Sequence, residues 1–368
     1  MNDPRNPALA SADPQPARRG TGWLLRQLRD VAIILVTSVV LMELAIRAYD
    51  YVSPSFIFGS TDYNRLYRPA PFSYDYDFRI NSRGFKDVEF TTEKAPGTIR
   101  VVALGDSFTY GAVPYDHTYV TLLKKALHER FGNVELLNMG IPGTGPRDYL
   151  ELFATEAAPL RPDVVVVSVF LGNDFVGGTR RVRSYLYELV RYVVRLRTQA
   201  RKHIYHGAGT YDDDAPVFTD EFYLQLERDR SLVFRRELGH IEPSVRTALN
   251  DLAEIKRLAD RLAVRLYMVL LPDEVQVDPD LRDKVLQSAG HPASDYDFGG
   301  LNRRISAFLD ALGVEHLDLL PGFLAQGGQT RLYRINDSHL NIAGNRLAAE
   351  MIFADMVRRP GLLGKESP

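Results

Sequence analysis

The chain has 368 residues, of which 45% are hydrophobic and 25% are charged, an ordinary composition for a packed globular protein. Its formal net charge of −2 argues against a general nucleic-acid binder, which carries a clear basic excess, so we expect no nucleic-acid partner. The chain contains no cysteine, which excludes disulfides, thiolate metal sites and cysteine nucleophiles.

One long apolar run lies near the N-terminus. The tail before it, residues 1–30, lacks apolar periodicity and is expected to be disordered and cytoplasmic. Between Val31 and Ile46 the sequence is apolar except for Thr37, Ser38 and Glu43. Five arginines precede this run, whereas only Arg47 lies in the stretch that follows, to Asn64. This asymmetry predicts a single transmembrane anchor over residues 31–48, which contacts the lipid bilayer and leaves the rest of the chain exported (periplasmic or extracytoplasmic).

Two alternatives to an anchor remain open. A cleaved signal peptide has the same apolar core, although no clean small-x-small site follows the run. A buried core helix would also be apolar, but it would not require one-sided arginines. The next segment, residues 49–98, is rich in tyrosine and punctuated by proline and glycine. We expect it to be an extended connector that packs on the domain after it.

Short apolar runs alternate with amphipathic helices from Ile99 onward. Five runs predict strands, at residues 100–104, 134–138, 164–170, 264–271 and 316–319. Apolar spacing predicts helices at residues 118–131, 147–158, 245–261, 301–312 and 342–357. This alternation predicts one α/β domain over residues 99–360, in which helices cover both faces of a parallel sheet. Reactive residues in such a sheet lie at the carboxyl ends of the strands.

An insertion at residues 175–245 interrupts the alternation. Within residues 180–202, an apolar stripe of helical spacing is accompanied by eight basic residues and a single acid, Glu188. Such a helix can lie on an anionic membrane surface, or it can pack its stripe on the domain and solvate its arginines, and both interpretations stay open. The acidic run at residues 212–214 lacks the spaced ligands of a calcium loop and is interpreted as a solvated loop.

Four short motifs follow the predicted strands and carry the chemistry. Gly105-Asp106-Ser107 comes directly after the first strand, where a serine N–H can point at a developing oxyanion. A glycine-rich loop from Asn138 to Gly145 comes after the second strand and permits close backbone approach to a ligand. Each motif alone is also typical of an ordinary turn.

The other two motifs supply an amide and a base. Gly172-Asn173-Asp174 follows the third strand, and an asparagine amide there can donate a hydrogen bond to an oxyanion. Asp337-Ser338-His339 precedes the last predicted helix. A neutral histidine can remove the serine proton, and a carboxylate on its other nitrogen fixes the tautomer. The four motifs together, at one edge of one sheet, predict a serine nucleophile with its base.

From about Ile99 to Val357 the chain resembles the SGNH/GDSL hydrolase superfamily. The resemblance implies a three-layer α/β/α sandwich with a five-stranded parallel, flavodoxin-like sheet, and no metal or other cofactor. It implies Ser107 as nucleophile and His339 as base, with the Ser107 N–H, Gly143 and the Asn173 amide as the oxyanion hole. By its spacing from Asn138, Gly143 rather than Gly140 matches the family's oxyanion glycine.

The acid departs from the commonest family pattern. That pattern places the carboxylate three residues before the histidine, where this chain has Asn336. Asp337, two residues before, is the available carboxylate, and this spacing resembles acetyltransferase-like branches that modify exopolysaccharides. Either Asp337 or a backbone carbonyl is expected to orient His339.

The sequence therefore predicts a membrane-anchored serine esterase, an acylhydrolase or O-acetylesterase that acts through an acyl-serine intermediate. Its expected substrate is an acyl ester on envelope or secreted glycans, a polysaccharide among them. One alternative is an O-acyltransferase that passes the acyl group to an extracytoplasmic polysaccharide, and another is a non-catalytic glycan-binding relative. The sequence identifies neither the acyl group, the acceptor, the oligomeric state nor a protein partner.

Overall fold

The computed structural model describes residues 21–52, 68–176, 184–187, 189–190, 193 and 209–363. The predicted basic helix at residues 180–202 falls mostly outside these residues. Of it, only Ser184 to Tyr187, Leu189, Val190 and Val193 are described.

A parallel sheet forms the centre of the domain. Its strands are β3 (Ile99–Leu104), β4 (Val134–Asn138), β5 (Val164–Phe170), β6 (Arg265–Leu271) and β7 (Glu315–Asp318). They lie in the order β4-β3-β5-β6-β7, and all neighbours are parallel. Every residue of β5 is buried, as expected for a central strand covered on both faces. The predicted five-stranded parallel sheet is confirmed.

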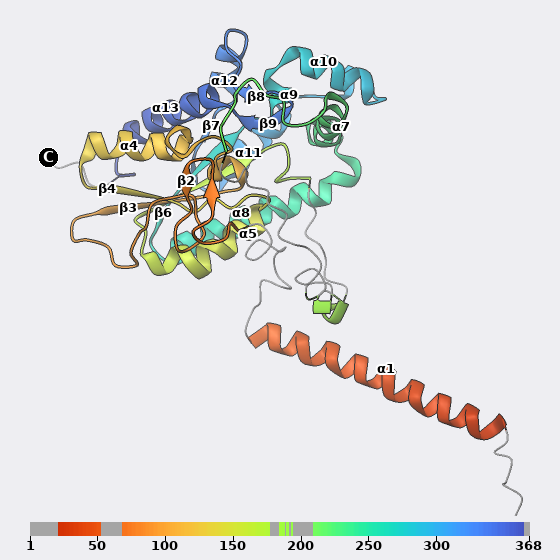
Figure 1. The fold of residues 1–368 in the computed structure, drawn as a ribbon. Coiled ribbons are helices and arrows are strands. Elements are labelled where there is room, and N and C mark those ends of the chain that lie inside the picture. The colour runs from red at the N-terminus through yellow and green to blue at the C-terminus, as the bar shows by residue number, and fades with distance from the viewer. Residues whose placement is uncertain are drawn as a thin grey trace, which may run out of the picture.

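Helices cover both faces of this sheet (Figure 1). One face packs against α4 (Tyr119–Phe131), α12 (Leu320–Gly327) and α13 (Ile342–Arg358), and their apolar side chains form one core cluster with residues of β3, β5 and β6. The other face packs against α5 (Pro146–Leu152), α8 (Glu242–Arg261) and α11 (Gly300–Ala311), which share a second cluster. The α/β/α sandwich therefore has its core in two layers.

The predicted helix at residues 147–158 is shorter than expected. The α-helix α5 ends at Leu152 and continues as a π-helical turn, Phe153–Ala157, and a 3₁₀ turn, Ala158–Leu160. Pro159 lies inside this last turn, and because proline lacks an N–H it cannot continue an α-helix there. Other 3₁₀ turns lie at Tyr115–His117, Leu232–Phe234, Gly239–Ile241 and Ala293–Asp295.

Several elements escaped the sequence analysis. The connector contains a small hairpin of β1 (Tyr74–Asp75) and β2 (Phe78–Arg79), and a second hairpin joins β8 (Tyr333–Arg334) to β9 (Asp337–Leu340). Additional helices are α3 (Ser107–Tyr110), α7 (Asp220–Ser231), α9 (Glu274–Val277) and α10 (Pro279–Ser288). These elements are short or lack a clear apolar period, so the sequence pattern does not reveal them.

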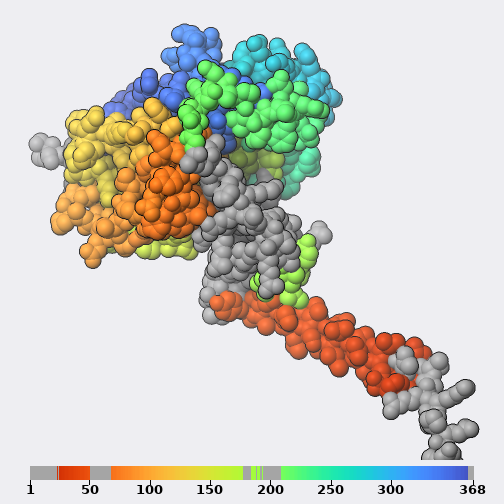
Figure 2. Space-filling view, viewed as in Figure 1, coloured from red at the N-terminus to blue at the C-terminus, as the bar shows by residue number. Residues whose placement is uncertain are grey.

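A single long helix, α1 (Thr21–Val52), extends away from the sandwich (Figures 1 and 2). Its apolar stretch, Leu25–Tyr49, has 25 residues, and none of its most apolar window is buried. A helix of that length spans about 37 Å, more than the hydrocarbon core of a bilayer. The helix is therefore long and apolar enough to be either a signal sequence or a membrane anchor.

Candidate active site

Ser107 begins the short helix α3 directly after β3. Asp106 caps this helix, since its Oδ1 accepts a hydrogen bond of 2.9 Å from the N–H of Phe108. The turn is so tight that a Cβ on Gly105 would lie 2.0 Å from Oγ1 of Thr109. Only glycine fits at this position, and this explains why a Gly-Asp-Ser sequence forms the turn.

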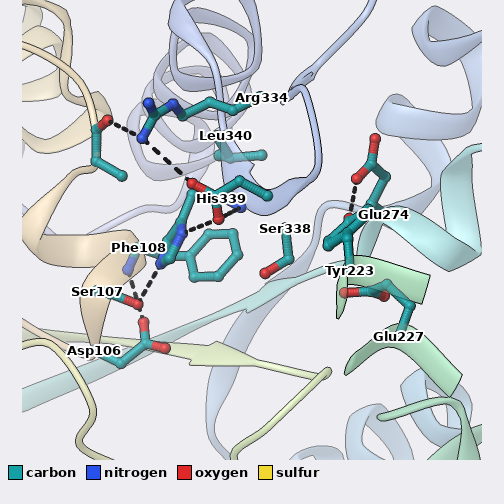
Figure 3. A network of polar contacts seen from close by, with 12 residues as sticks. Asp106, Ser107, Phe108, Tyr223, Glu227, Glu274, Arg334, Ser338, His339 and Leu340 are labelled. Carbon is teal, nitrogen blue, oxygen red and sulfur yellow. Dashed lines mark hydrogen bonds and ion pairs between the residues drawn. The ribbon is translucent and has the colours of Figure 1, made fainter. Parts of the chain in front are cut away.

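His339 lies between a hydroxyl and a carboxylate (Figure 3). Its Nε2 is 2.7 Å from Ser107 Oγ, and its Nδ1 is 2.6 Å from Asp337 Oδ1. Because an ionised carboxylate only accepts hydrogen bonds, Nδ1 carries the proton and Nε2 accepts from the serine hydroxyl. The structure thus joins Ser107, His339 and Asp337 in one hydrogen-bonded line.

The histidine lies in a place that the sequence analysis did not foresee. His339 belongs to β9, which pairs with β8 in an antiparallel hairpin outside the central sheet. Ser107, Gly143 and Asn173 do follow strands of the central sheet, at its carboxyl edge. The base therefore reaches the nucleophile from a separate hairpin.

Asp337 is 3% exposed and stays ionised in the fold. Burial raises its pKa, but the His339 ring, its hydrogen bonds and the Arg334 guanidinium outweigh that effect and hold the pKa below its usual value. Nη1 of Arg334 lies 3.3 Å from Asp337 Oδ2, the oxygen that does not contact the histidine. The sequence analysis missed this arginine; its only sequence signal is its place three residues before Asp337.

Asn336, at the family's usual acid position, is directed elsewhere. Its side chain donates to the carbonyl of Phe218 at 3.1 Å and to Oδ1 of Asp220, so it contacts the insertion. Its φ of 51° puts it in the left-handed region, which asparagine tolerates better than most residues. The hairpin turn therefore directs the Asn336 side chain toward the insertion and the Asp337 side chain toward the histidine.

The two other predicted oxyanion residues lie on loops beside the nucleophile turn. Asn138 holds the first loop: its amide donates to Thr109 O at 3.0 Å, and its Oδ1 accepts from Gly140 N at 3.0 Å. A Cβ on Gly140 would lie 2.3 Å from Tyr110 N, so Gly140 serves close packing. Gly143 is exposed and has a φ of 72°, a left-handed conformation that favours glycine.

Asn173 is half-buried after β5 and lies next to Asp106. Burial raises the pKa of Asp106 to about 6, and the hydrogen bond from the Phe108 N–H opposes this effect. An asparagine amide has two N–H groups that can donate to an acceptor beside Ser107. Asp174 is buried beside it and accepts hydrogen bonds from Tyr149 and from the Phe170 N–H.

A cluster of buried acids adjoins the triad on the far side of Ser338 (Figure 3). Glu227 comes from α7 of the insertion, and Glu274 begins α9 after β6. Burial raises the pKa of Glu274 to about 8, although a hydrogen bond from the Tyr223 hydroxyl opposes the shift. Arg230 donates to Glu227 Oε1 at 3.0 Å and to the Ser338 hydroxyl, so the insertion is tied to the residue between Asp337 and His339.

The comparisons with known proteins point to one family. The model of the GDSL-like Lipase/Acylhydrolase family matches residues 103–347. No curated protein matches the chain. Solved structures resemble it over most of their length, among them an acetyl xylan esterase with 17% identity, 70% coverage of this chain, 99% of that chain and a TM-score of 0.41.

Two further structures are similar at the same level. A lipolytic G-D-S-L family member from Veillonella parvula has 14% identity, coverages of 71% and 100%, and a TM-score of 0.41. A catalytic mutant of an acetylxylan esterase from Geobacillus stearothermophilus has 12% identity, coverages of 72% and 95%, and a TM-score of 0.38. Likenesses at this level say nothing about the substrate of this chain.

Proposed function

The chain belongs to the GDSL-like lipase/acylhydrolase family, and we propose that it is a membrane-anchored serine esterase that removes acyl groups from envelope or secreted glycans. The observation that carries this proposal is the hydrogen-bonded line from Ser107 Oγ through the His339 ring to Asp337. A nucleophile, its base and an orienting carboxylate at hydrogen-bond distance are what acyl transfer through serine requires.

The reaction we propose has two steps. His339 Nε2 takes the hydroxyl proton of Ser107 while Oγ attacks the ester carbonyl, and Asp337 stabilises the imidazolium that forms. The same proton then passes to the leaving alcohol, and an acyl-serine remains. Water, deprotonated by His339, attacks the acyl-serine, the bond to Ser107 Oγ breaks, and the proton passes from His339 to Oγ as the carboxylic acid leaves.

Three donors stabilise the tetrahedral intermediate in this proposal. They are the N–H of Ser107 at the start of α3, the N–H of Gly143, and the Asn173 amide. The left-handed conformation of Gly143 and the capping of α3 by Asp106 support this assignment, because both fix the backbone around a donor before substrate binds. Loss of one such donor costs about 3–4 kcal/mol of transition-state stabilisation.

We assign α1 to a retained anchor rather than to a cleaved signal. Glu43, inside the apolar stretch, accepts hydrogen bonds from Ser184 Oγ at 3.0 Å, Tyr185 N at 2.9 Å and Leu186 N at 2.8 Å. An acidic residue in a membrane helix is costly unless it has partners; Arg47, one turn further along α1, forms an ion pair with Glu43, and these donors from the insertion add to it. Cleavage after α1 would remove Glu43 and leave these donors without it. The arginines before the helix support a cytoplasmic N-terminus and an exported domain.

The test assays the full-length protein in detergent on two substrates, a chromogenic acetate ester and an acetylated oligosaccharide. The assay on the chromogenic ester is repeated with an unacetylated oligosaccharide as acceptor. We expect hydrolysis of both esters and none with Ser107→Ala. Product that appears only when an unacetylated oligosaccharide is added, and that is an acylated sugar rather than free acetate, would establish the acyltransferase alternative. No covalent labelling of Ser107 by a fluorophosphonate would refute serine chemistry altogether.

A further inference from the structure

Three consecutive carbonyls follow the nucleophile helix, and side chains from distant segments bind all of them. Nζ of Lys86 donates to Gly111 O at 2.9 Å and to Val113 O at 2.6 Å. The carbonyl between them, Ala112 O, accepts from the Tyr76 hydroxyl at 3.3 Å and from Nη1 of Arg334 at 3.3 Å. Lys86 and Tyr76 come from the connector, which precedes the sheet in sequence.

Lys86 is fully buried, and its ammonium group forms an ion pair with Asp75. Both Lys86 and Asp75 are 0% exposed and form an ion pair, so the three ammonium hydrogens are directed at Asp75, Gly111 O and Val113 O. Burial lowers the pKa of Lys86, and Asp75 opposes this effect. A buried ion pair often adds little to stability compared with an apolar pair. The pair is better explained by the position it gives the Lys86 ammonium group, which binds the carbonyls of Gly111 and Val113.

These contacts lead directly to the nucleophile. The N–H of Gly111 donates to the carbonyl of Ser107 itself at 2.9 Å, and the carbonyl of Gly111 accepts from Lys86. Gly111 therefore links Lys86 directly to Ser107. On the other side, Arg334 binds both Ala112 O and Asp337 Oδ2. The loop at residues 111–113 therefore connects the nucleophile turn to the acid of the triad.

We propose that Lys86, held by Asp75, is a positioning residue that fixes the Ser107 turn relative to His339, and that the part of the connector from Asp75 to Lys86 therefore belongs to the catalytic unit. The proposal rests on Ser107 as nucleophile. An error of about 1 Å in the position of a reacting group can cost about 100-fold in rate. We expect removal of the ammonium to lower kcat about 10- to 100-fold and to leave KM nearly unchanged, because the fully buried Lys86 side chain is not accessible to substrate.

The test compares variants of the full-length protein. Lys86→Met leaves Asp75 buried without its cation, so the paired variant Asp75→Leu/Lys86→Met, which removes both charges, guards against a failure to fold. Lys86→Arg keeps the charge, but a planar guanidinium cannot direct hydrogens at three acceptors around one nitrogen, and we expect no rescue. Lys94→Met is the matched control, since Lys94 also joins the connector to the domain, through Asp163 at 2.7 Å, and its side chain is 21% exposed.

The measurements are kcat per active site titrated with a fluorophosphonate, KM, the rate of fluorophosphonate labelling and the melting temperature. We expect the paired variant to label and turn over at least 10-fold more slowly per site than the Lys94→Met variant. Equal turnover per titrated site, with only a lower melting temperature, would reduce Lys86 to a structural residue and overturn the proposal. Failure of the wild-type enzyme to label would instead refute the proposed function.

Discussion

At the scale of single residues, the environment of each charged group decides its role. Asp337 and Glu274 are both buried carboxyls, 3% and 9% exposed. Asp337 lies between a histidine and an arginine, so its pKa is lowered, whereas burial without a comparable cation raises the pKa of Glu274 to about 8. One carboxyl is therefore available as a charged partner for His339, and the other keeps a proton at neutral pH.

The acid of the triad gives the sharpest prediction at this scale. Asp337→Asn should lower kcat by up to about 10⁴, because the amide favours the wrong histidine tautomer while keeping the shape of the side chain. Asn336→Ala, the matched control in the same turn, should change kcat per active site little, since Asn336 contacts the insertion and not the histidine. Near-wild-type kcat in Asp337→Asn over a range of pH would reduce the site to a Ser–His dyad.

The oxyanion assignment makes a separate prediction. Asn173→Ala should lower kcat by roughly 10²–10³ with little change in KM, because its donor acts mainly in the transition state. Steady-state kinetics on the chromogenic acetate separate the two constants. A raised KM with an unchanged kcat would show that Asn173 only binds the substrate.

At the scale of elements, the insertion is joined to the catalytic hairpin. The helix α7 contributes Arg230, which binds the Ser338 hydroxyl, and Tyr223, which binds Glu274. In the turn between β8 and β9, the Asn336 side chain donates to the carbonyl of Phe218, which also belongs to the insertion. Because Ser338 lies between Asp337 and His339, the Arg230 contact makes the insertion a support for the acid and base, whereas Asn336 contacts the insertion without contacting the histidine.

The Glu274 carboxyl predicts how stability depends on pH. Its pKa rises from 4.5 to about 8 on folding, so between these values the folded state holds a proton that the unfolded chain has lost. The stabilising contribution of Glu274 to the free energy of unfolding is therefore complete below pH 4.5 and is lost as the pH rises through about 8. Denaturant unfolding should show a free energy of unfolding that falls with pH in this window.

Glu274→Gln, which cannot ionise, should flatten this dependence, and the exposed Glu129→Gln on α4 serves as the control. An equal slope in the wild type and in Glu274→Gln would show that Glu274 ionises normally in the folded protein.

At the scale of the whole molecule, the apolar helix and the α/β sandwich differ in how far their apolar side chains are buried. The described apolar side chains of α1 are mostly exposed, whereas those of the sheet and its helices are buried in two clusters. Figure 2 shows α1 extending from the body of the molecule. An exposed apolar surface of this length is stable in water only when something covers it, and a bilayer provides such cover.

The anchor prediction follows from this arrangement. The full-length protein should remain in the membrane pellet after alkaline carbonate extraction, and protease added outside the inner membrane should digest the domain while an N-terminal tag stays protected. Release of the intact chain by carbonate would contradict an anchor. A mature protein that begins after residue 46 would show a signal peptide instead.

The sequence by itself determined the sheet, most of its helices and the identity of the four motifs. The strand β5 at Val164–Phe170 and the helix α4, capped by Thr118 and ended at Gly132, match the predicted elements because both depend on patterns within a few residues. The proximity of Ser107 to His339, 232 residues apart, was also predictable in outline, since each motif marks an active-site loop. The choice between Asp337 and a backbone carbonyl as the partner of His339 was not, because it depends on the hairpin turn.

Only the tertiary structure decided which charged residues surround the site. Lys86, Arg334 and Arg230 lie in the connector, in β8 and in the insertion, and each looks like an ordinary basic residue in the sequence. Their partners, Val113, Ala112 and Ser338, come from other segments, so no local spacing marks these pairs. The role of such a charge is decided when folding removes its water and leaves only specific protein partners, and this depends on packing between segments rather than on the order of residues within one.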